Sequence, residues 1–267
     1  MATTASHLSI LRQLRRDTGN DDLTIDTAKT FAAMDKRYIP SSTRGALCAL
    51  RKEYPDNKVF IDEMKKRGPA YKAMDQSQQP TQKQIDKFVS WDNILLFRDA
   101  YYEEMTPINR LLMALYTRIP PVRLDYTPMK IVSRKPTKLE DGMNYYVRGK
   151  TQYFLFHAFK THAVLGDMKT IIPVALRKEL DSFVKPGQTY LLQDETGQPW
   201  MDQRLSQTVQ RIFREYHNLN TGVSMLRHAY ATKFHKGQLP LAEIKKTASA
   251  MHHGPLQSMT YRFISLE

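Results

Sequence analysis

Four residues whose side chains could perform phosphoryl chemistry follow one another near the end of this sequence. Arg227, His252, His253 and Tyr261 lie in SMLRHAYATKFHKGQLPLAEIKKTASAMHHGPLQSMTYRF. A guanidinium stays charged and makes forked hydrogen bonds to phosphate oxygens, which a lysine does less well. A tyrosine becomes a nucleophile when its proton is removed or when nearby cations stabilise its phenolate. The set therefore suits attack by a tyrosine on a phosphodiester, whose nonbridging oxygens gain charge during the reaction.

The order and spacing of these residues resemble the tyrosine recombinase (integrase) family, in the branch found in viruses and mobile elements. That family has His-x-x-Arg, then a His or Trp, then a nucleophilic Tyr, and Arg227 and Tyr261 match the last arginine and the nucleophile. His252 has the family's spacing to the tyrosine and His253 has its Met-x-His context, so both remain candidates. Ser224 stands where the family has its first histidine, and a serine hydroxyl can still orient a phosphate oxygen or a water.

Two further positions implied by the resemblance lie upstream. In RIPPVRLDYTPMKI, Arg123 matches the family's first arginine, which precedes a short helix, and Arg118 is the competing choice. In HAFKTHAVLGDMKTIIPVA, Lys160 matches the family's lysine, expected on a strand of a β-hairpin just before the turn. The resemblance implies that the arginines contact the scissile phosphate, that Lys160 protonates the leaving 5′-oxygen, and that the histidine forms a hydrogen bond to a nonbridging oxygen.

The function that the resemblance implies is site-specific DNA recombination or integration, including integration of a viral genome. Tyr261 would form a 3′-phosphotyrosyl intermediate, and religation would need neither ATP nor a metal because the covalent bond preserves the energy of the broken one. The sequence accordingly holds no GxxxxGK[ST] loop and no HExxH helix, and we expect no cofactor and no metal. A type IB topoisomerase that relaxes DNA and a DNA-binding protein that has lost catalysis are the alternatives.

Composition supports a nucleic-acid partner. The formal net charge is +13 with 40 Lys and Arg residues, and such a charge favours polyanions because basic side chains release counterions from phosphates. Cys48 is the single cysteine, which excludes an internal disulfide and a Cys-rich zinc site. The sequence lacks an apolar run long enough for a membrane span and an evident signal peptide. We expect an intracellular protein, in the nucleus or cytoplasm of a host, that binds duplex DNA and no membrane.

The elements that must position these residues form two predicted domains. Residues 28–74 have helical periodicity, with Ser41 or Ser42 as a helix cap. The polar stretch 75–84 is a candidate linker, so we predict a helical DNA-binding domain over 1–80, loosely similar to the family's core-binding domain, and a catalytic domain over 81–267.

The catalytic domain is predicted to be helix, sheet, helix. Helical spacing occurs in WDNILLFRDAYYEE, in TPINRLLMALYTR, with Thr106 and Pro107 at its start, and in the segments after LRKELDSFV. MNYYVRG, TQYFLFHAFKT and KTIIPVA predict a three-stranded antiparallel sheet. The fold class is thus mainly α with a small antiparallel sheet (α+β). By resemblance, the two domains would close as a C-shaped clamp on DNA, with a monomer or dimer free and a tetramer on recombination sites.

Overall fold

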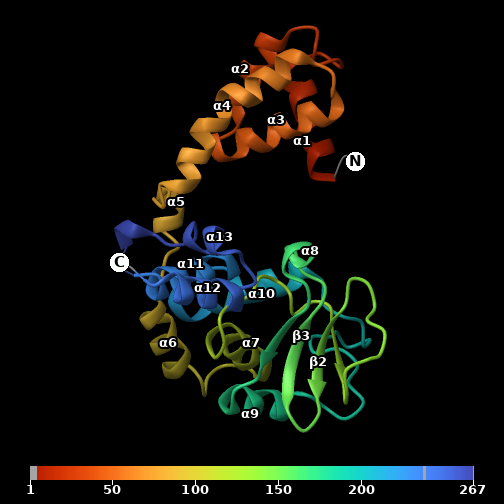
Figure 1. Cartoon of the computed structure of the whole chain (residues 1–267), viewed down its shortest axis with the longest axis vertical. Coiled ribbons are helices and arrows are strands. Elements are labelled where there is room, and N and C mark those ends of the chain that lie inside the picture. The colour runs from red at the N-terminus through yellow and green to blue at the C-terminus, as the bar shows by residue number, and fades with distance from the viewer. Residues whose placement is uncertain (1–4, 237–238, 267) are drawn as a thin grey trace. The chain divides into compact units, whose positions relative to one another are not determined.

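The computed structural model describes residues 5–236 and 239–266, which divide into two compact units, Met1–Ser77 and Gln78–Glu267 (Figure 1). Each unit has a hydrophobic core of its own. The described helices include none that is long and apolar enough to cross a membrane.

The first unit consists of helices. They are α1 (Ala5–Thr18), α2 (Thr27–Arg37), α3 (Pro40–Glu53) and α4 (Lys58–Gln76). Asp26 and Asn57 cap α2 and α4 by accepting hydrogen bonds from backbone N–H groups in the first turn. Leucines of α1 and α3 pack with Phe60 in the hydrophobic core of this unit. The helical prediction for this region is therefore confirmed.

The predicted cap of α3 is wrong. The helix begins at Pro40 with Ile39 at the N-cap, so neither Ser41 nor Ser42 precedes it. Proline is favoured in the first turn because its fixed φ suits a helix and its missing N–H would have no partner there.

The second unit is mostly helical. Its helices before the sheet are α5 (Gln82–Ile85), α6 (Trp91–Ala100) and α7 (Pro107–Thr117), and those within and after it are α8 (His162–Leu165), α9 (Val174–Phe183), α10 (Asp202–His217), α11 (Val223–Phe234), α12 (Leu241–Ala250), α13 (Pro255–Met259) and the 3₁₀ turn η1 (Ile264–Leu266). Thr106 caps α7 by accepting from the Asn109 N–H, and Pro107 occupies the first turn, as predicted.

The sheet has four strands rather than three, and it is mixed rather than antiparallel. The strands are β1 (Met129–Val132), β2 (Asn144–Arg148), β3 (Gln152–Phe156) and β4 (Met168–Ile171), in the order β1-β2-β3-β4. The antiparallel pairs β2–β3 and β3–β4 correspond to the three predicted strands. β1 pairs parallel to β2 and was missed, because four residues after a proline give too short a pattern to separate a strand from a loop.

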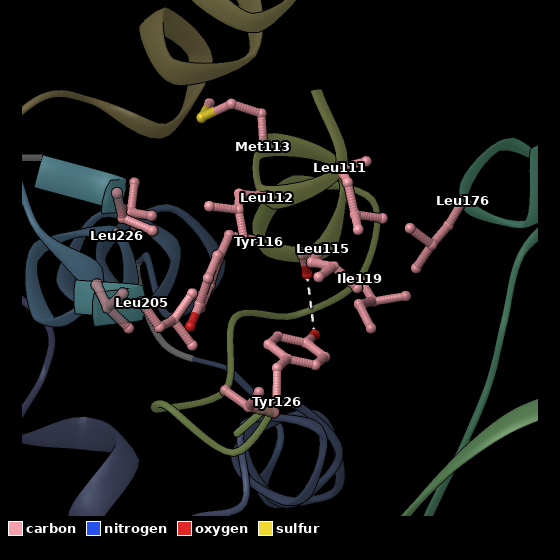
Figure 2. Packing of buried hydrophobic residues seen from close by; sticks show 14 of the residues in the cluster. Leu111, Leu112, Met113, Leu115, Tyr116, Ile119, Tyr126, Leu176, Leu205 and Leu226 are labelled. Atoms are coloured by element: carbon pink, nitrogen blue, oxygen red, sulfur yellow. Dashed lines mark hydrogen bonds between the residues drawn. The ribbon is translucent and has the colours of Figure 1, made fainter. Parts of the chain in front are cut away.

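Helix α7 lies at the centre of the core of this unit. Its residues from Leu111 to Thr117 are all buried, and Figure 2 shows leucines of α9, α10 and α11 around it. The Tyr126 hydroxyl donates to the Leu115 carbonyl at 3.0 Å, which attaches the chain after α7 to the helix. In Figure 1 the helices α11–α13 gather at one side of this unit and the sheet at the other.

Candidate active site

Arg227 is the centre of the cluster of predicted site residues. It lies in the middle of α11 with only 1% of its surface exposed. Its guanidinium donates to the Pro121 carbonyl at 2.7 Å and to the Met251 carbonyl at 3.2 Å. One side chain therefore joins the segment before Arg123, helix α11 and the end of α12.

His253 and Tyr261 both contact this guanidinium. Arg227 Nη2 donates to His253 Nε2, and the Arg227 guanidinium carbon lies 5.2 Å from the centre of the Tyr261 ring. The rings of His253 and Tyr261 are 4.6 Å apart. A guanidinium nitrogen can only donate, so His253 Nε2 accepts and the proton of the neutral imidazole resides on Nδ1.

Burial and neighbouring cations set the protonation states here. Burial lowers the pKa of Arg227 most, Tyr261 opposes that effect, and the charge of Arg123 adds to it. The pKa of His253 falls to about 2, because of burial first and then the charges of Arg227 and Arg123. In the free protein His253 is thus a neutral hydrogen-bonding group at physiological pH and not an acid.

The two candidate arginines after α7 lie in different places. Arg123 lies close enough to the cluster for its charge to act on both Arg227 and His253. Arg118 ends α7 and lies 3.9 Å from the Asp99 carboxylate. No short helix follows Arg123, because the chain from residue 118 to 128 has turns and bends before β1, so that part of the expectation is wrong.

The adjacent histidines point to different partners. His252 has a φ of +56°, a left-handed backbone conformation that turns the chain sharply between the two rings. Its Nδ1 lies 3.3 Å from the Asp125 carboxylate, and its ring packs edge-on against Phe156, with ring centres 4.4 Å apart. The structure therefore brings His253, and not His252, against Arg227 and Tyr261.

Lys160 and Ser224 lie near the cluster without a hydrogen bond to it. Lys160 is exposed in the turn between β3 and β4, and the expectation that it lies on a strand is wrong because β3 ends at Phe156. The next residue, Thr161, donates to the His252 carbonyl at 2.8 Å, which holds the turn beside the histidines. Ser224 is exposed on the first turn of α11, one turn before Arg227.

His228 supports the backbone of Tyr261. Its Nδ1 lies 2.7 Å from the Tyr261 carbonyl, and its ring stacks on Phe263 with 4.2 Å between ring centres. Burial lowers the pKa of His228 to about 4. The neutral ring therefore donates from Nδ1 and fixes the chain at Tyr261 and Phe263.

Two positioning residues were missed by the sequence prediction. Asp125 accepts from the Arg123 N–H at 3.3 Å and faces His252. Asn144 is fully buried and makes four hydrogen bonds: its amide donates to the carbonyls of Asp125 and Ala158, and its oxygen accepts from the N–H groups of His157 and Ala158. The one available signal was a polar residue at the start of the apolar run NYYV, which does not reveal these partners.

Two guanidinium nitrogens in the cluster are buried donors for which residues 5–236 and 239–266 supply no acceptor. They are Arg123 Nη1 and Arg227 Nε. A buried donor without a partner costs free energy, and a charged one costs more. An anion bound between the two arginines would remove that cost.

Comparisons with known proteins give a structural likeness but no match in sequence. The chain matches no family model and no curated protein sequence. A solved structure described as "Crystal structure of XerA recombinase" is similar over 96% of this chain and 84% of that one, with 15% sequence identity and a TM-score of 0.47.

Proposed function

We propose that this protein is a DNA strand-exchange enzyme of the tyrosine recombinase type, with Tyr261 as the nucleophile. The observation that carries the proposal is the buried Arg227 guanidinium in contact with both His253 and Tyr261. These residues come from separate segments of the chain. A packing tyrosine would not by itself need a buried, incompletely paired cation beneath its ring.

The proposed reaction uses the cluster as an anion site. Arg123 and Arg227 donate to the nonbridging oxygens of the scissile phosphate, and their two unpaired nitrogens supply donors for it. His253 donates from Nδ1 to one of these oxygens. Charge that develops on them in the transition state meets donors already in place, which is the largest electrostatic contribution in many enzymes.

The covalent step conserves bonds and protons. The Tyr261 oxygen forms a bond to phosphorus while the bond from phosphorus to the 5′-oxygen breaks. Lys160 gives a proton to that leaving oxygen, and the phenol proton passes to solvent. Attack of a 5′-hydroxyl of another strand reverses the step and releases Tyr261 without ATP.

The proposal extends to the rest of the chain as follows. The basic first unit grips the duplex, protomers pair on recombination sites as a tetramer, and Ser224 orients a phosphate oxygen in place of the family's histidine. The viral or mobile-element origin of the branch and integration as the preferred outcome belong to the proposal as well.

The test is trapping of the covalent intermediate. Because the target sequence is unknown, the full chain is incubated with nicked duplexes of randomised sequence, whose nick lets the short fragment that bears the new 5′-hydroxyl diffuse away. We expect a covalent protein–DNA band with the wild type and with Tyr230→Phe, a half-buried tyrosine of α11 that serves as control. Tyr261→Phe should give no band. An unchanged band in that variant rejects the nucleophile assignment.

The DNA recovered from the covalent band allows recombination to be distinguished from the alternative activities. The recovered duplex sequences are placed in pairs on a plasmid. Joining of two sites supports recombination, whereas relaxation of supercoils without joining indicates topoisomerase activity. Duplex binding with no band in any variant indicates a protein that binds DNA without cleaving it.

A further inference from the structure

The connection between β3 and β4 carries a cluster of possible metal ligands outside the proposed active site. His157 Nδ1 lies 2.7 Å from Asp167 Oδ1, and His162 Nε2 lies 3.0 Å from the same oxygen. One ligand atom from each residue lies within 4.8 Å of the other two. The two imidazole rings meet edge to face, with 4.8 Å between their centres.

This donor set selects among metals. Two imidazole nitrogens and one carboxylate oxygen form a three-residue set that Zn²⁺ binds in tetrahedral sites, whereas Mg²⁺ and Ca²⁺ require oxygen ligands. Zinc–nitrogen bonds of about 2.0–2.1 Å place neighbouring tetrahedral donors about 3.3 Å apart. The observed nitrogen–oxygen separations of 2.7 and 3.0 Å would open by a few tenths of an ångström, and the two imidazole nitrogens, which lie within 4.8 Å of each other, would adjust to the same spacing.

The exposure of the cluster also suits a cation. The side chains of His157, His162 and Asp167 are 23%, 34% and 36% exposed, which leaves a path for a metal from solvent. The same opening provides room for a water as fourth ligand.

We propose that His157, His162 and Asp167 bind one zinc ion, with water at the fourth position. The three ligands come from the segment just after β3, the start of α8 and the residue before β4. The ion would join three points of a connection that otherwise has a four-residue helix and turns. This proposal replaces the sequence-based expectation that the chain holds no metal.

The site has a consequence for Lys160, which rests on the proposed function. Lys160 lies between His157 and His162, so a metal bound to both restricts the segment that presents its ammonium. The hydrogen bond from Thr161 to the His252 carbonyl holds the same segment beside the proposed active site. Zinc would act as a positioning element for the proton donor and take no part in phosphoryl transfer.

Zinc binding is measured on the full chain, independently of any DNA reaction. Protein freed of metal with a chelator is titrated with Zn²⁺ in competition with a chromophoric chelator, and Co²⁺ absorption reports a tetrahedral site of nitrogen and oxygen ligands. We expect one Zn²⁺ per wild-type chain. His162→Ala and Asp167→Asn should each weaken binding at least about 100-fold, because even outer-shell changes at zinc sites cost about 10–100-fold.

The control is Asp141→Asn, which removes an exposed carboxylate of the same unit and should leave the affinity unchanged. Hydrogen exchange of residues 157–167 should slow on addition of Zn²⁺ in the wild type and in Tyr261→Phe, but not in Asp167→Asn. Absence of stoichiometric binding by the wild type, or equal affinity of wild type and the His157→Ala/His162→Ala double variant, overturns the proposal. Neither readout involves cleavage, so failure of the recombinase proposal would leave the zinc result standing.

Discussion

At the scale of single residues, the proposed active site depends on the Arg227 guanidinium, which both joins chain segments and contacts the proposed catalytic side chains. Arg227 donates to the carbonyls of Pro121 and Met251 while it contacts His253 and Tyr261. A buried cation that keeps these partners costs desolvation free energy, which lowers its pKa. The planar arrangement of the guanidinium N–H donors therefore matters for the site as much as the positive charge does.

Arg227→Lys tests this dependence on shape. The variant keeps one positive charge but cannot donate to both carbonyls and a phosphate oxygen together. We expect covalent complex formation to fall on the order of 100–1000-fold, as for removal of a preorganised donor to a developing charge. The rate is measured on nicked duplex at saturating protein. Retention of more than a tenth of the wild-type rate would show that charge alone suffices.

His228 gives a stability prediction with a defined pH window. Its pKa is lowered from 6.5 to about 4 in the folded state, so the unfolded chain takes up this proton more readily. The stabilisation from His228 is complete above pH 6.5 and is lost as pH falls towards 4. The change amounts to at most about 3 kcal/mol, from about 1.4 kcal/mol for each pKa unit.

His228→Phe removes this titration and keeps a ring to stack on Phe263. Urea denaturation at several values between pH 7 and pH 4 should show a smaller loss of unfolding free energy in the variant than in the wild type. The variant is less stable at pH 7 because the hydrogen bond to the Tyr261 carbonyl is gone. Parallel pH profiles would contradict a buried neutral His228.

At the scale of elements, the turn after β3 and the segment containing Arg123 are joined through one strand residue. Asn144, the first residue of β2, bonds to Asp125, to His157 and twice to Ala158. The segments that carry Arg123 and Lys160 therefore share an anchor. Asp125 extends it to His252.

Asn144→Ala should both destabilise the second unit and slow the reaction. Loss of four hydrogen bonds leaves buried carbonyl and N–H groups without partners, and we expect about 3 kcal/mol lower unfolding free energy. The matched control is Asn93→Ala on α6, an exposed residue whose loss should cost less than about 0.5 kcal/mol. Chemical denaturation measures the unfolding free energies of both variants. Equal unfolding free energies for the two variants would show that the hydrogen bonds of Asn144 contribute little.

At the scale of the whole molecule, charge is distributed over both units. Residues 1–77 have 14 Lys and Arg against 10 Asp and Glu, and residues 78–267 have 26 against 17. Both units are thus net basic. Part of this charge is internally paired, as in the contacts of Arg67 with Asp35 and Glu63.

Duplex DNA binding should therefore be strongly salt-dependent. If about 6–10 phosphates are neutralised, affinity falls about 10³–10⁵-fold between 50 and 200 mM salt. Fluorescence anisotropy with a labelled duplex of arbitrary sequence measures the slope. Residues 78–267 alone should show a shallower slope than the full chain. A slope near zero for the full chain would exclude phosphate neutralisation as the source of affinity.

The sequence by itself determined most of the longer helices, three of the four strands and the order of Arg123, Lys160, Arg227 and Tyr261, because these follow from local periodicity and spacing. It left β1 unseen, since a parallel edge strand takes its identity from a neighbour distant along the chain. It also missed Asn144, whose partners come from two segments distant from each other along the chain.

Only the tertiary structure brought His253 rather than His252 against Arg227, through the left-handed backbone at His252 that turns the adjacent rings to different sides. It likewise placed Arg123 in the cluster and Arg118 beside Asp99, and gathered His157, His162 and Asp167 around one point. The amino-acid sequence specifies residue types, their order and their spacing along the chain. Direction and distance between side chains depend on packing, which a single sequence does not display.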